Sequence, residues 1–268
     1  MEKKKMKKIL ALILALVMCV GALVSCGSEK DLKKIEKAGK LVVGVTVYPP
    51  MDYIDGEGNW TGFDAELAQQ FAASLGVNCQ IVIIDWNNKV AELKSRQIDL
   101  IWNGMTATDE LGKEIDFSVS YAKNAQVAVV KKDSGITKDA IAGLTVAVEN
   151  GSAGETIARE TLGIKDGKLV ERSDGQVGAL GEVLSGNAQV AIIDVTMAES
   201  QVGKGSYAGL EIVSGASYGD EIFAVGLRKD SDLKEKLDEF LKAKYKDGTL
   251  AALAAKYEVS LNTEALGK

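Results

Sequence analysis

Small polar residues follow an apolar run in the sequence IDLIWNGMTATDEL. The run, residues 98–102, is short enough for a buried strand and too short for a helix. Asn103, Gly104, Thr106 and Thr108 can form hydrogen bonds but pack poorly. Ligands of open α/β sheets lie beyond the carboxyl ends of the strands. The segment is therefore placed to meet a polar ligand, and the alternative is an ordinary loop.

Two further segments could bind charged groups. Asp194 ends the apolar run 190–193, where its carboxylate could make charge-assisted hydrogen bonds or cap the following helix, 195–202. The sequence ENGSAGE, residues 149–155, is a turn that leads into a helix, and the free amides at the start of a helix attract anions. This turn is not a phosphate loop, because no Gly-Lys-Ser/Thr follows it.

Catalytic chemistry has few candidates in this chain. It contains no histidine, which excludes Ser-His and Cys-His catalytic pairs and most zinc sites. A general acid or base would have to be a carboxylate, a lysine or a tyrosine, and Glu149 with Asp194 is the one pair we can name. An enzyme is therefore disfavoured, and we expect no cofactor and no metal.

Residues 1–25 are predicted to be a secretion signal. Five lysines stand among the first eight residues, and the run 9–24 is apolar and uncharged. The sequence LVSC, which ends at Cys26, resembles the bacterial lipobox and implies a lipid on Cys26. Cys19 is a poorer candidate, because bulky Met18 precedes it. The alternative is a signal that is cut at small residues, with Cys26 merely nearby.

The charge balance limits the partners. The chain has 32 basic and 38 acidic residues, and loss of the lysine-rich signal makes it more acidic still. An acidic chain has no electrostatic basis for binding nucleic acid, so we expect contact with the membrane only through the lipid. With Cys26 acylated, no disulfide is expected, and Cys79 should pack as a small apolar residue.

Strand-like and helical patterns alternate from residue 40 onward, which predicts an α/β fold with helices on the faces of a sheet. Residues 27–39 are polar and suit a tether followed by a first helical turn. Periodicity alone leaves open whether there is one large sheet or two α/β lobes.

Three segments together resemble the polar amino-acid-binding proteins of bacterial ABC importers. They are YPPMDYIDGEGNWTGFDAELAQQFAASLG, DWNNKVAELKSRQIDLIWNGMTATDEL, and VAVENGSAGE with IIDVTMAES. The likeness extends from about residue 40 to 260. Its most specific part is GFD at residues 62–64, preceded by YPP at residues 48–50.

This resemblance implies the type II periplasmic-binding-protein fold, in which two α/β lobes are joined by two crossing strands and enclose a ligand cleft. Lobe 1 would comprise residues 40–122 and 223–268, and lobe 2 residues 123–222. A lipidated tether, residues 26–39, would precede them. Members of the family are usually monomers, so we expect a monomer.

The resemblance also implies the ligand contacts. Tyr48 and Trp86 match aromatic positions on opposite sides of the ligand, where rings suit an aliphatic chain or a cation. Their alternatives are a turn residue and a core aromatic. The positions that match contacts to the ligand's ammonium are Asn103, Gly104, Thr106 and Asp194, and those that match contacts to its carboxylate are Ser152, Ala153 and Gly154.

One position departs from the family pattern. Leu111 stands where the family has an arginine that clamps the ligand's carboxylate, and the nearest cation along the chain, Lys113, cannot replace an arginine fork. Glu149 lies at the predicted edge of the pocket. The predicted pocket charges, Glu149 and Asp194, are then both negative, without a matched positive group.

Two classes of ligand fit this pattern. One is an amino acid whose carboxylate rests on the amides around Ser152 alone. The other is a cationic ligand, such as a basic amino acid, an amine or a quaternary ammonium compound. Burial of two unpaired carboxylates is costly, which slightly favours the cationic ligand. A basic side chain that entered the pocket from elsewhere would remove this argument.

The predicted function is that of a lipoprotein on the outer face of the cell membrane. It would capture an amino acid or a related cationic amine and deliver it, by hinge closure, to an ABC permease and its ATPase. The alternatives are a dehydratase-like enzyme on the same fold and a ligand-sensing surface domain.

Overall fold

The computed structural model describes residues 30–268. The predicted signal, residues 1–25, and the predicted lipid site, Cys26, lie outside the described residues. Within the described range, none of the helices combines the length and the apolar character needed to cross a bilayer.

The first sheet has five strands in the order β4, β1, β5, β12 and β6. Their bounds are Asn78–Ile83, Lys40–Val45, Leu100–Ile101, Gly226–Leu227 and Asp116–Phe117. Strand β1 is parallel to β4 and β5, whereas β12 is antiparallel to β5 and β6. The carboxyl ends of the parallel strands therefore meet at one edge of the sheet.

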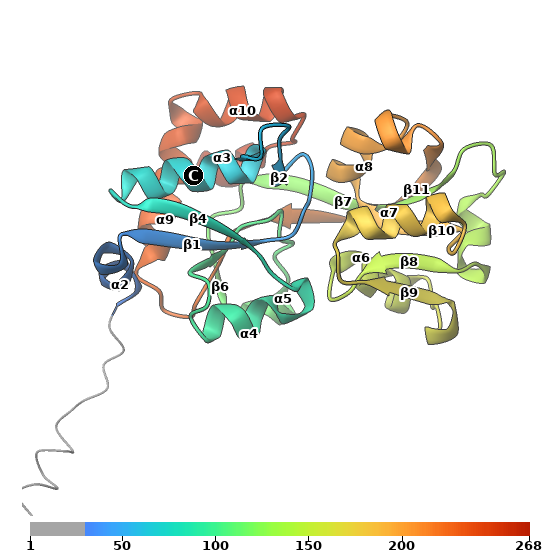
Figure 1. Ribbon diagram of the computed structural model, residues 1–268, viewed down its shortest axis with the longest axis horizontal. Helices are drawn as coiled ribbons and strands as arrows, with labels where there is room; N and C mark the ends of the chain where they lie inside the picture. The colour runs from blue at the N-terminus through green and yellow to red at the C-terminus, as the bar shows by residue number, and fades with distance from the viewer. Residues whose placement is uncertain (1–29) are drawn as a thin grey trace, which may run out of the picture. The chain divides into compact units, whose positions relative to one another are not determined.

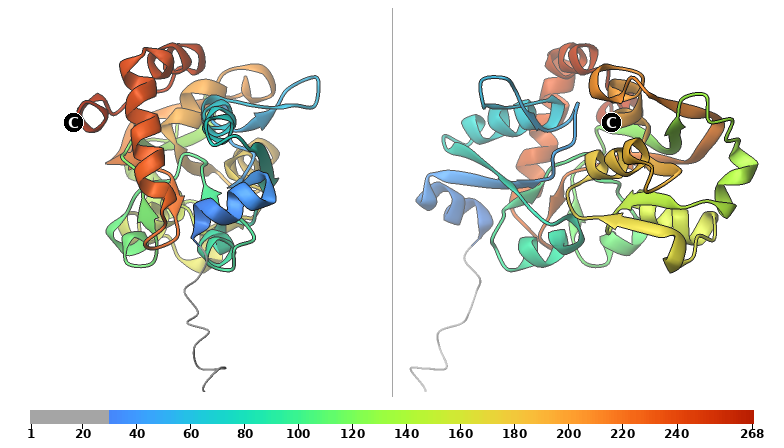
Figure 2. Two further views of the ribbon diagram at one scale, coloured as in Figure 1. Left: turned by 90° about the vertical axis from the view of Figure 1, so that its left-hand side faces the viewer. Right: turned by 45° about the vertical axis from the view of Figure 1, so that its right-hand side comes forward.

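Helices cover both faces of this sheet. Figure 1 shows α3 and α10 on one face and α4 on the other. The elements outside the sheet are α2 (Asp31–Ala38), β2 (Tyr53–Ile54), β3 (Trp60–Thr61), α3 (Phe63–Ser74), the 3-10 turn η1 (Trp86–Asn88), α4 (Lys89–Lys94), α5 (Asp109–Gly112), α9 (Leu233–Lys246), α10 (Thr249–Tyr257) and α11 (Thr263–Leu266). The C-terminal helices α9 and α10, drawn in red in Figure 2, contact each other, and α10 contacts α3.

The second sheet has the strand order β11, β7, β10, β8 and β9. Their bounds are Leu210–Phe223, Ala122–Lys131, Val190–Asp194, Val146–Glu149 and Leu169–Arg172. Strand β7 is antiparallel to β10 and β11, and β8 is parallel to β10 and β9. The accompanying elements are η2 (Lys138–Gly143), α6 (Ala153–Thr156), the π-helical turn η3 (Ile157–Thr161), η4 (Asp166–Lys168), α7 (Gln176–Ser185), α8 (Val195–Gln201) and η5 (Gly205–Tyr207).

Two paired strands connect the lobes. The chain enters the second sheet along β7 and leaves it along β11, and the two strands are antiparallel partners up to the pair Ala122 and Phe223. Phe223 also forms a bridge with Thr106, which lies beyond the end of β5. The fold prediction of two α/β lobes with two crossing strands is confirmed, and the single-sheet alternative is excluded.

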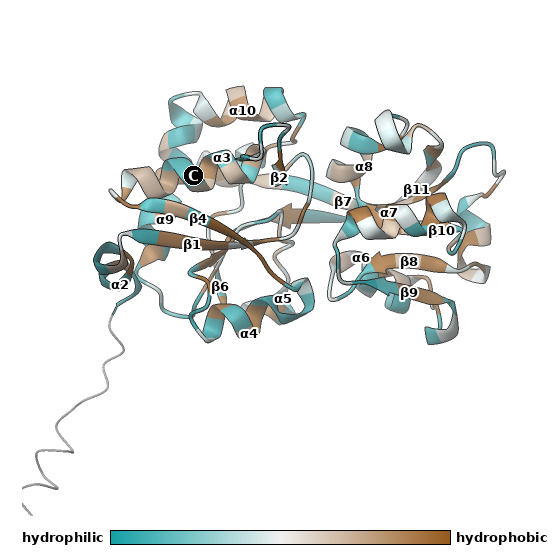
Figure 3. Cartoon of the chain, viewed as in Figure 1, coloured by the Kyte–Doolittle hydropathy of each residue, from teal (hydrophilic) through white to brown (hydrophobic). Residues whose placement is uncertain are grey.

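Apolar strands form the core of each lobe. In β1, Leu41, Val43 and Val45 are fully buried, and β10 is buried along its whole length. Figure 3 shows β1 and β8 mostly in brown, the colour of apolar residues. Strands that are covered on both faces require such continuous apolar sequence.

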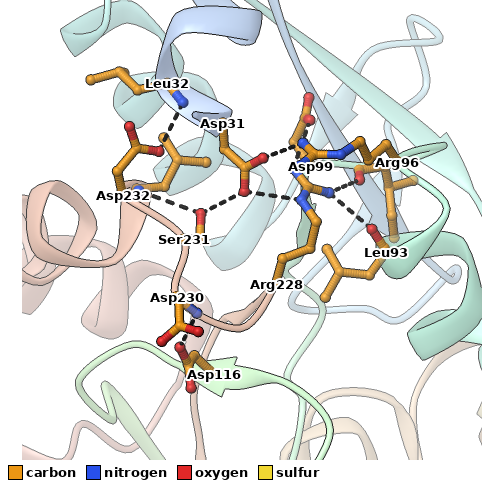
Figure 4. Close-up of polar contacts among 12 residues, drawn as sticks. Asp31, Leu32, Leu93, Arg96, Asp99, Asp116, Arg228, Asp230, Ser231 and Asp232 are labelled. Carbon is orange, nitrogen blue, oxygen red and sulfur yellow. Dashed lines mark hydrogen bonds and ion pairs between the residues drawn. The ribbon is translucent and has the colours of Figure 1, made fainter. Parts of the chain in front are cut away.

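Helix α2 occupies part of the predicted tether. Asp31, its first residue, is buried and accepts hydrogen bonds from Arg96, from Arg228 Nε at 2.9 Å and from Ser231 Oγ at 2.7 Å (Figure 4). The backbone amide of Leu32 donates to Asp232 at 3.0 Å. The helical turn expected at the end of residues 27–39 is present as α2, and its charged partners lie far away in the chain.

Candidate ligand-binding site

A cavity of about 240 Å³ lies between the strand ends of the two lobes. Every predicted contact residue except Gly154 lines it: Tyr48, Trp86, Asn103, Gly104, Thr106, Leu111, Glu149, Ser152, Ala153 and Asp194. Gly154 lies behind this surface, because a Cβ added to it would come within 2.6 Å of the Ile192 carbonyl oxygen. The cavity thus brings together segments that are widely separated in the sequence.

Asp194 ends β10 and is only 4% exposed. Its Oδ1 accepts hydrogen bonds from the side-chain amides of Asn124 and Gln126, the latter at 2.6 Å, and its Oδ2 accepts one from Gln176. Burial, together with the charge of Glu221, raises its pKa to about 6 against the effect of these hydrogen bonds. All three donors are neutral amides, so they orient the carboxylate without neutralising it.

The predicted alternative for Asp194 was a helix cap. Asp194 does precede α8, but its side chain makes no capping hydrogen bond to that helix. Instead its own backbone amide donates to Gln176 Oε1 at 2.9 Å. The carboxylate is therefore directed toward the cavity and its amide partners rather than toward the helix.

Tyr48 packs against the backbone of Gly104. A Cβ added to Gly104 would lie 2.5 Å from Tyr48 Cε1, and the φ angle of Gly104 is +54°, so both space and conformation require glycine. Among the described residues, the buried Tyr48 hydroxyl has no hydrogen-bond partner. Burial and the charge of Asp194 raise its pKa well above the ordinary value, which keeps it protonated.

The GFD sequence at residues 62–64 positions the polar segment beyond β5. Asp64 Oδ2 accepts hydrogen bonds from the Gly104 amide at 2.6 Å and from the Tyr121 hydroxyl at 2.7 Å. Gly62 has a φ of +120°, and a Cβ there would lie 2.2 Å from the Met51 carbonyl oxygen. This motif therefore supports the site from behind rather than lining the cavity.

The side chain of Asn103 has a structural role. Its Oδ1 accepts hydrogen bonds from the amide and the hydroxyl of Thr46, each at 2.9 Å. Its Nδ2 donates to Asp52 at 2.7 Å and to the Thr46 carbonyl at 3.1 Å. These bonds join the ends of β1 and β5, so any ligand contact from Asn103 would have to come from its backbone.

Glu221 forms a second acidic centre behind the cavity. Its Oε2 accepts hydrogen bonds from the Thr106 hydroxyl at 3.0 Å, from Asn124 at 2.8 Å and from Gln126 at 3.0 Å. The amides of Asn124 and Gln126 thus lie between the carboxylates of Glu221 and Asp194. Neither this pair of amides nor Glu221 was among the residues predicted from the sequence.

Glu149 ends β8 and is 3% exposed, and its Oε1 has no hydrogen-bond partner within residues 30–268. Burial and the negative charge of Asp194 raise its pKa to about 8, although Lys89 and Thr46 oppose the rise. Glu149 therefore lines the pocket as predicted. With a pKa of about 8, its carboxyl group keeps its proton at neutral pH.

Lys89 corrects the predicted charge of the pocket. It lines the cavity and is 6% exposed, so a basic side chain does enter the pocket beside Glu149 and Asp194, and this removes the basis for favouring a cationic ligand. Its Nζ lies 4.8 Å from the centre of the Trp86 ring. Lys89 begins α4 directly after two asparagines, where a lysine gives no sign of burial.

Leu111 lies in α5 and lines the cavity. Thr108 caps this helix, because its hydroxyl accepts a hydrogen bond from the Leu111 amide at 3.2 Å. Glu110 and Glu114 also line the cavity, but their carboxylates are exposed and paired with Lys113 at 2.7 Å and Lys94 at 2.6 Å. The rim therefore adds little unpaired charge. No acidic or cysteine cluster within residues 30–268 is arranged to hold a metal ion.

Residues 41–260 match the bacterial extracellular solute-binding proteins, family 3. The chain belongs to this family. The family assignment agrees with the two-lobed fold and with a cavity between the lobes. The predictions of a solute-binding protein and of the type II periplasmic-binding-protein fold are confirmed, and the protein is not an enzyme.

Relatives of this family 3 protein carry amino-acid names. The arginine-binding extracellular protein ArtP of Bacillus subtilis is 34% identical, over 94% of this chain and 98% of its own. The L-cystine-binding protein TcyJ of Escherichia coli is 31% identical, over 91% of this chain and 92% of its own. A solved structure of a mutant of ArgBP from T. maritima superposes with a TM-score of 0.78 at 34% identity, covering 85% of this chain and 98% of that one.

Proposed function

We propose that the cavity binds an amino acid or a related amine, with the ligand's ammonium group on Asp194. The observation that carries this proposal is a buried carboxylate at a strand end, held only by neutral amides of Asn124, Gln126 and Gln176. Such a group binds a cation strongly, because charge-assisted hydrogen bonds exceed neutral ones. The amino-acid names of the relatives support the same ligand class.

Unpaired polar atoms support a ligand rich in donors. Tyr48 Oη, Gln126 Oε1 and Glu149 Oε1 belong to cavity-lining residues and have no partner in the described part of the chain. Buried polar atoms without partners are costly. Gln126 Oε1 can only accept a hydrogen bond, and the Tyr48 hydroxyl oxygen can also accept one. A bound ammonium group would relieve that cost.

The remaining predicted contacts complete the proposal. The backbone carbonyls of Asn103 and Gly104 and the hydroxyl oxygen of Thr106 would accept further ammonium protons. The rings of Tyr48 and Trp86 would flank the ligand's side chain. A larger set would lie near its carboxylate or its far end: Leu111, Glu149, and the amides of Ser152 and Ala153, with Gly154 behind them.

Lys89 bears on the choice between the two ligand classes. A purely cationic ligand was favoured because Glu149 and Asp194 had no positive group beside them. Lys89 is such a group, so this reason no longer holds. We therefore favour an amino acid that keeps its carboxylate, and a simple amine is the alternative.

The wider role follows from the family. The protein would deliver its ligand to an ABC permease and its ATPase after the lobes, residues 40–122 with 223–268 and residues 123–222, close around it. A lipid on Cys26 would hold it, as a monomer, on the outer face of the cell membrane.

Thermal unfolding of the chain without residues 1–26 tests the proposal. A ligand at a hundredfold its Kd stabilises the folded state by about 2.7 kcal/mol, which raises Tm by several degrees at roughly 2–4 °C per kcal/mol. We expect at least one amino acid among the common twenty, ornithine and cystine to do so. If neither these nor the corresponding amines shift Tm, the proposed ligand class is wrong.

A further inference from the structure

Lys89 is a cation held inside the cavity by backbone oxygens alone. Its Nζ donates to the Trp86 carbonyl at 3.1 Å and to the Gly151 carbonyl at 2.8 Å. Trp86 belongs to the first lobe and Gly151 to the second. Two of the three ammonium protons are used in this way, and one remains for another acceptor.

The position of the ammonium group is well defined. Gly151 approaches the first lobe so closely that a Cβ added to it would lie 2.8 Å from Asn87 Cα. The lysine stem is buried, and its head lies over the Trp86 ring at 4.8 Å. A side chain fixed at both its stem and its head loses little further freedom when it binds a ligand.

The acidic groups near Lys89 are occupied or neutral. Asp85 caps η1 by accepting from the Asn87 amide at 3.1 Å, and it also accepts from Asn88. Glu155 is paired with Arg159 at 2.5 Å. The carboxyl group of Glu149 keeps its proton at neutral pH. Burial lowers the pKa of Lys89 to about 8 against the charges of Glu149, Asp85 and Glu155, so the ammonium group is charged at neutral pH. Within residues 30–268, Lys89 forms no ion pair, so its third proton is left for a partner outside the chain.

We infer that Lys89 binds the carboxylate of the ligand and makes the cavity select amino acids over the corresponding amines. The inference rests on the proposed function, since it assumes that the ligand's ammonium lies on Asp194. Lys89 comes from the first lobe and Asp194 from the second, so a zwitterion would join the lobes through its two charged ends. Leu111 stands where the family has an arginine that binds the ligand's carboxylate with two hydrogen bonds. Lys89 would supply the positive charge instead, as a point charge.

The test compares four amino acids with their decarboxylated amines: L-arginine with agmatine, L-lysine with cadaverine, L-histidine with histamine, and L-cystine with cystamine. Kd values are measured by calorimetry for the wild-type chain, for Lys89→Met and for Lys242→Met. Lys242 is an exposed lysine of α9 that does not line the cavity, which makes its substitution a matched control.

We expect the wild-type protein to bind its amino acid at least tenfold more tightly than the matching amine. Lys89→Met should reduce that ratio by about tenfold to a hundredfold, because one charge-assisted hydrogen bond is lost. Lys242→Met should leave the ratio unchanged, and Lys89→Arg should keep most of it.

Two outcomes would overturn the inference, and a third would overturn the proposed function on which it rests. Equal affinity of the wild-type protein for an amino acid and its amine would do so without any variant, and would leave the proposed function intact. An equal loss of affinity for both compounds in Lys89→Met would make Lys89 only a structural link between the lobes. Failure of the wild-type protein to bind any of the eight compounds would instead contradict the proposed function for these ligands.

Discussion

Gln126 lies directly opposite Asp194 in the register of β7 and β10, and its Nε2 donates to the Asp194 carboxylate at 2.6 Å. The same Nε2 donates to Glu221 at 3.0 Å. One neutral amide therefore separates two carboxylates at the base of the cavity. It keeps Asp194 in place without supplying the positive charge that we assign to the ligand.

Replacing Gln126 by Met should destabilise the ligand-free protein by about 1–3 kcal/mol, because it leaves buried acceptors without their donor. Urea unfolding measures the change. Gln97→Met is a suitable control, since Gln97 is exposed. Equal stabilities of the two variants would show that the hydrogen bonds from Gln126 to Asp194 and Glu221 contribute nothing to the free energy of unfolding.

Gly104→Ala should both destabilise the protein and weaken ligand binding. The new methyl group would meet Tyr48 at 2.5 Å, and the backbone would be held at a φ of +54°. Gly76 has a φ of +72° with nothing within 4 Å of an added Cβ, so Gly76→Ala shares the backbone strain without the clash. Each strained backbone costs on the order of 1 kcal/mol. We expect a larger loss of Tm at Gly104, and a loss of ligand affinity only there.

The stability of the ligand-free protein should fall as the pH rises from about 5 to about 8. In the folded chain Glu149 keeps its proton to a pH of about 8, whereas the unfolded chain releases it near 4.5. Between these values the folded state binds the extra proton, so the free energy of unfolding decreases with pH. Asp194 contributes in the same direction at lower pH, since its folded pKa is about 6.

Glu149→Gln isolates that contribution. The variant should lose less stability than the wild-type chain between pH 5 and pH 8, by on the order of 1–3 kcal/mol. Urea unfolding at several pH values provides the measurement. Parallel pH profiles for the two proteins would contradict a raised pKa at Glu149.

Asp31→Asn should destabilise the first lobe without changing ligand affinity. The buried carboxylate is the shared partner of Arg96 and Arg228, and removing one member of such a pair costs on the order of 3 kcal/mol. Glu36→Gln, on the exposed side of α2, is the control. A lower Tm for Asp31→Asn with an unchanged Kd is the expected result, and a changed Kd would show that α2 influences the cavity.

The positions at strand ends could be predicted because their pattern is local. Asn103 and Gly104 follow the apolar residues of β5, and Asp194 closes β10, so an abrupt change from apolar to polar residues identified them without knowledge of the fold. The two lobes could not be derived from periodicity. They required the resemblance to a family, because strand order depends on pairing between distant segments.

The residues that were missed depend on such distant pairing. Lys89 follows two asparagines at the start of α4, where a lysine normally indicates a solvent-exposed position, and its burial involves Gly151 of the other lobe. Gln126 lies within a strand, and the antiparallel register alone places it beside Asp194. Asp31 belongs to a charged segment whose partner, Arg228, is distant in the sequence.

Calorimetric titration of the wild-type protein and of Asp194→Asn, with the amino acid that raises Tm most, tests the central claim most directly. The variant keeps the size of the side chain, and Asp139→Asn on the exposed surface of the second lobe is the control. Loss of a buried charged partner should weaken binding by at least about thirtyfold, while the control keeps the wild-type Kd. If Asp194→Asn is folded and binds with the wild-type Kd, the ligand's ammonium group does not lie on Asp194.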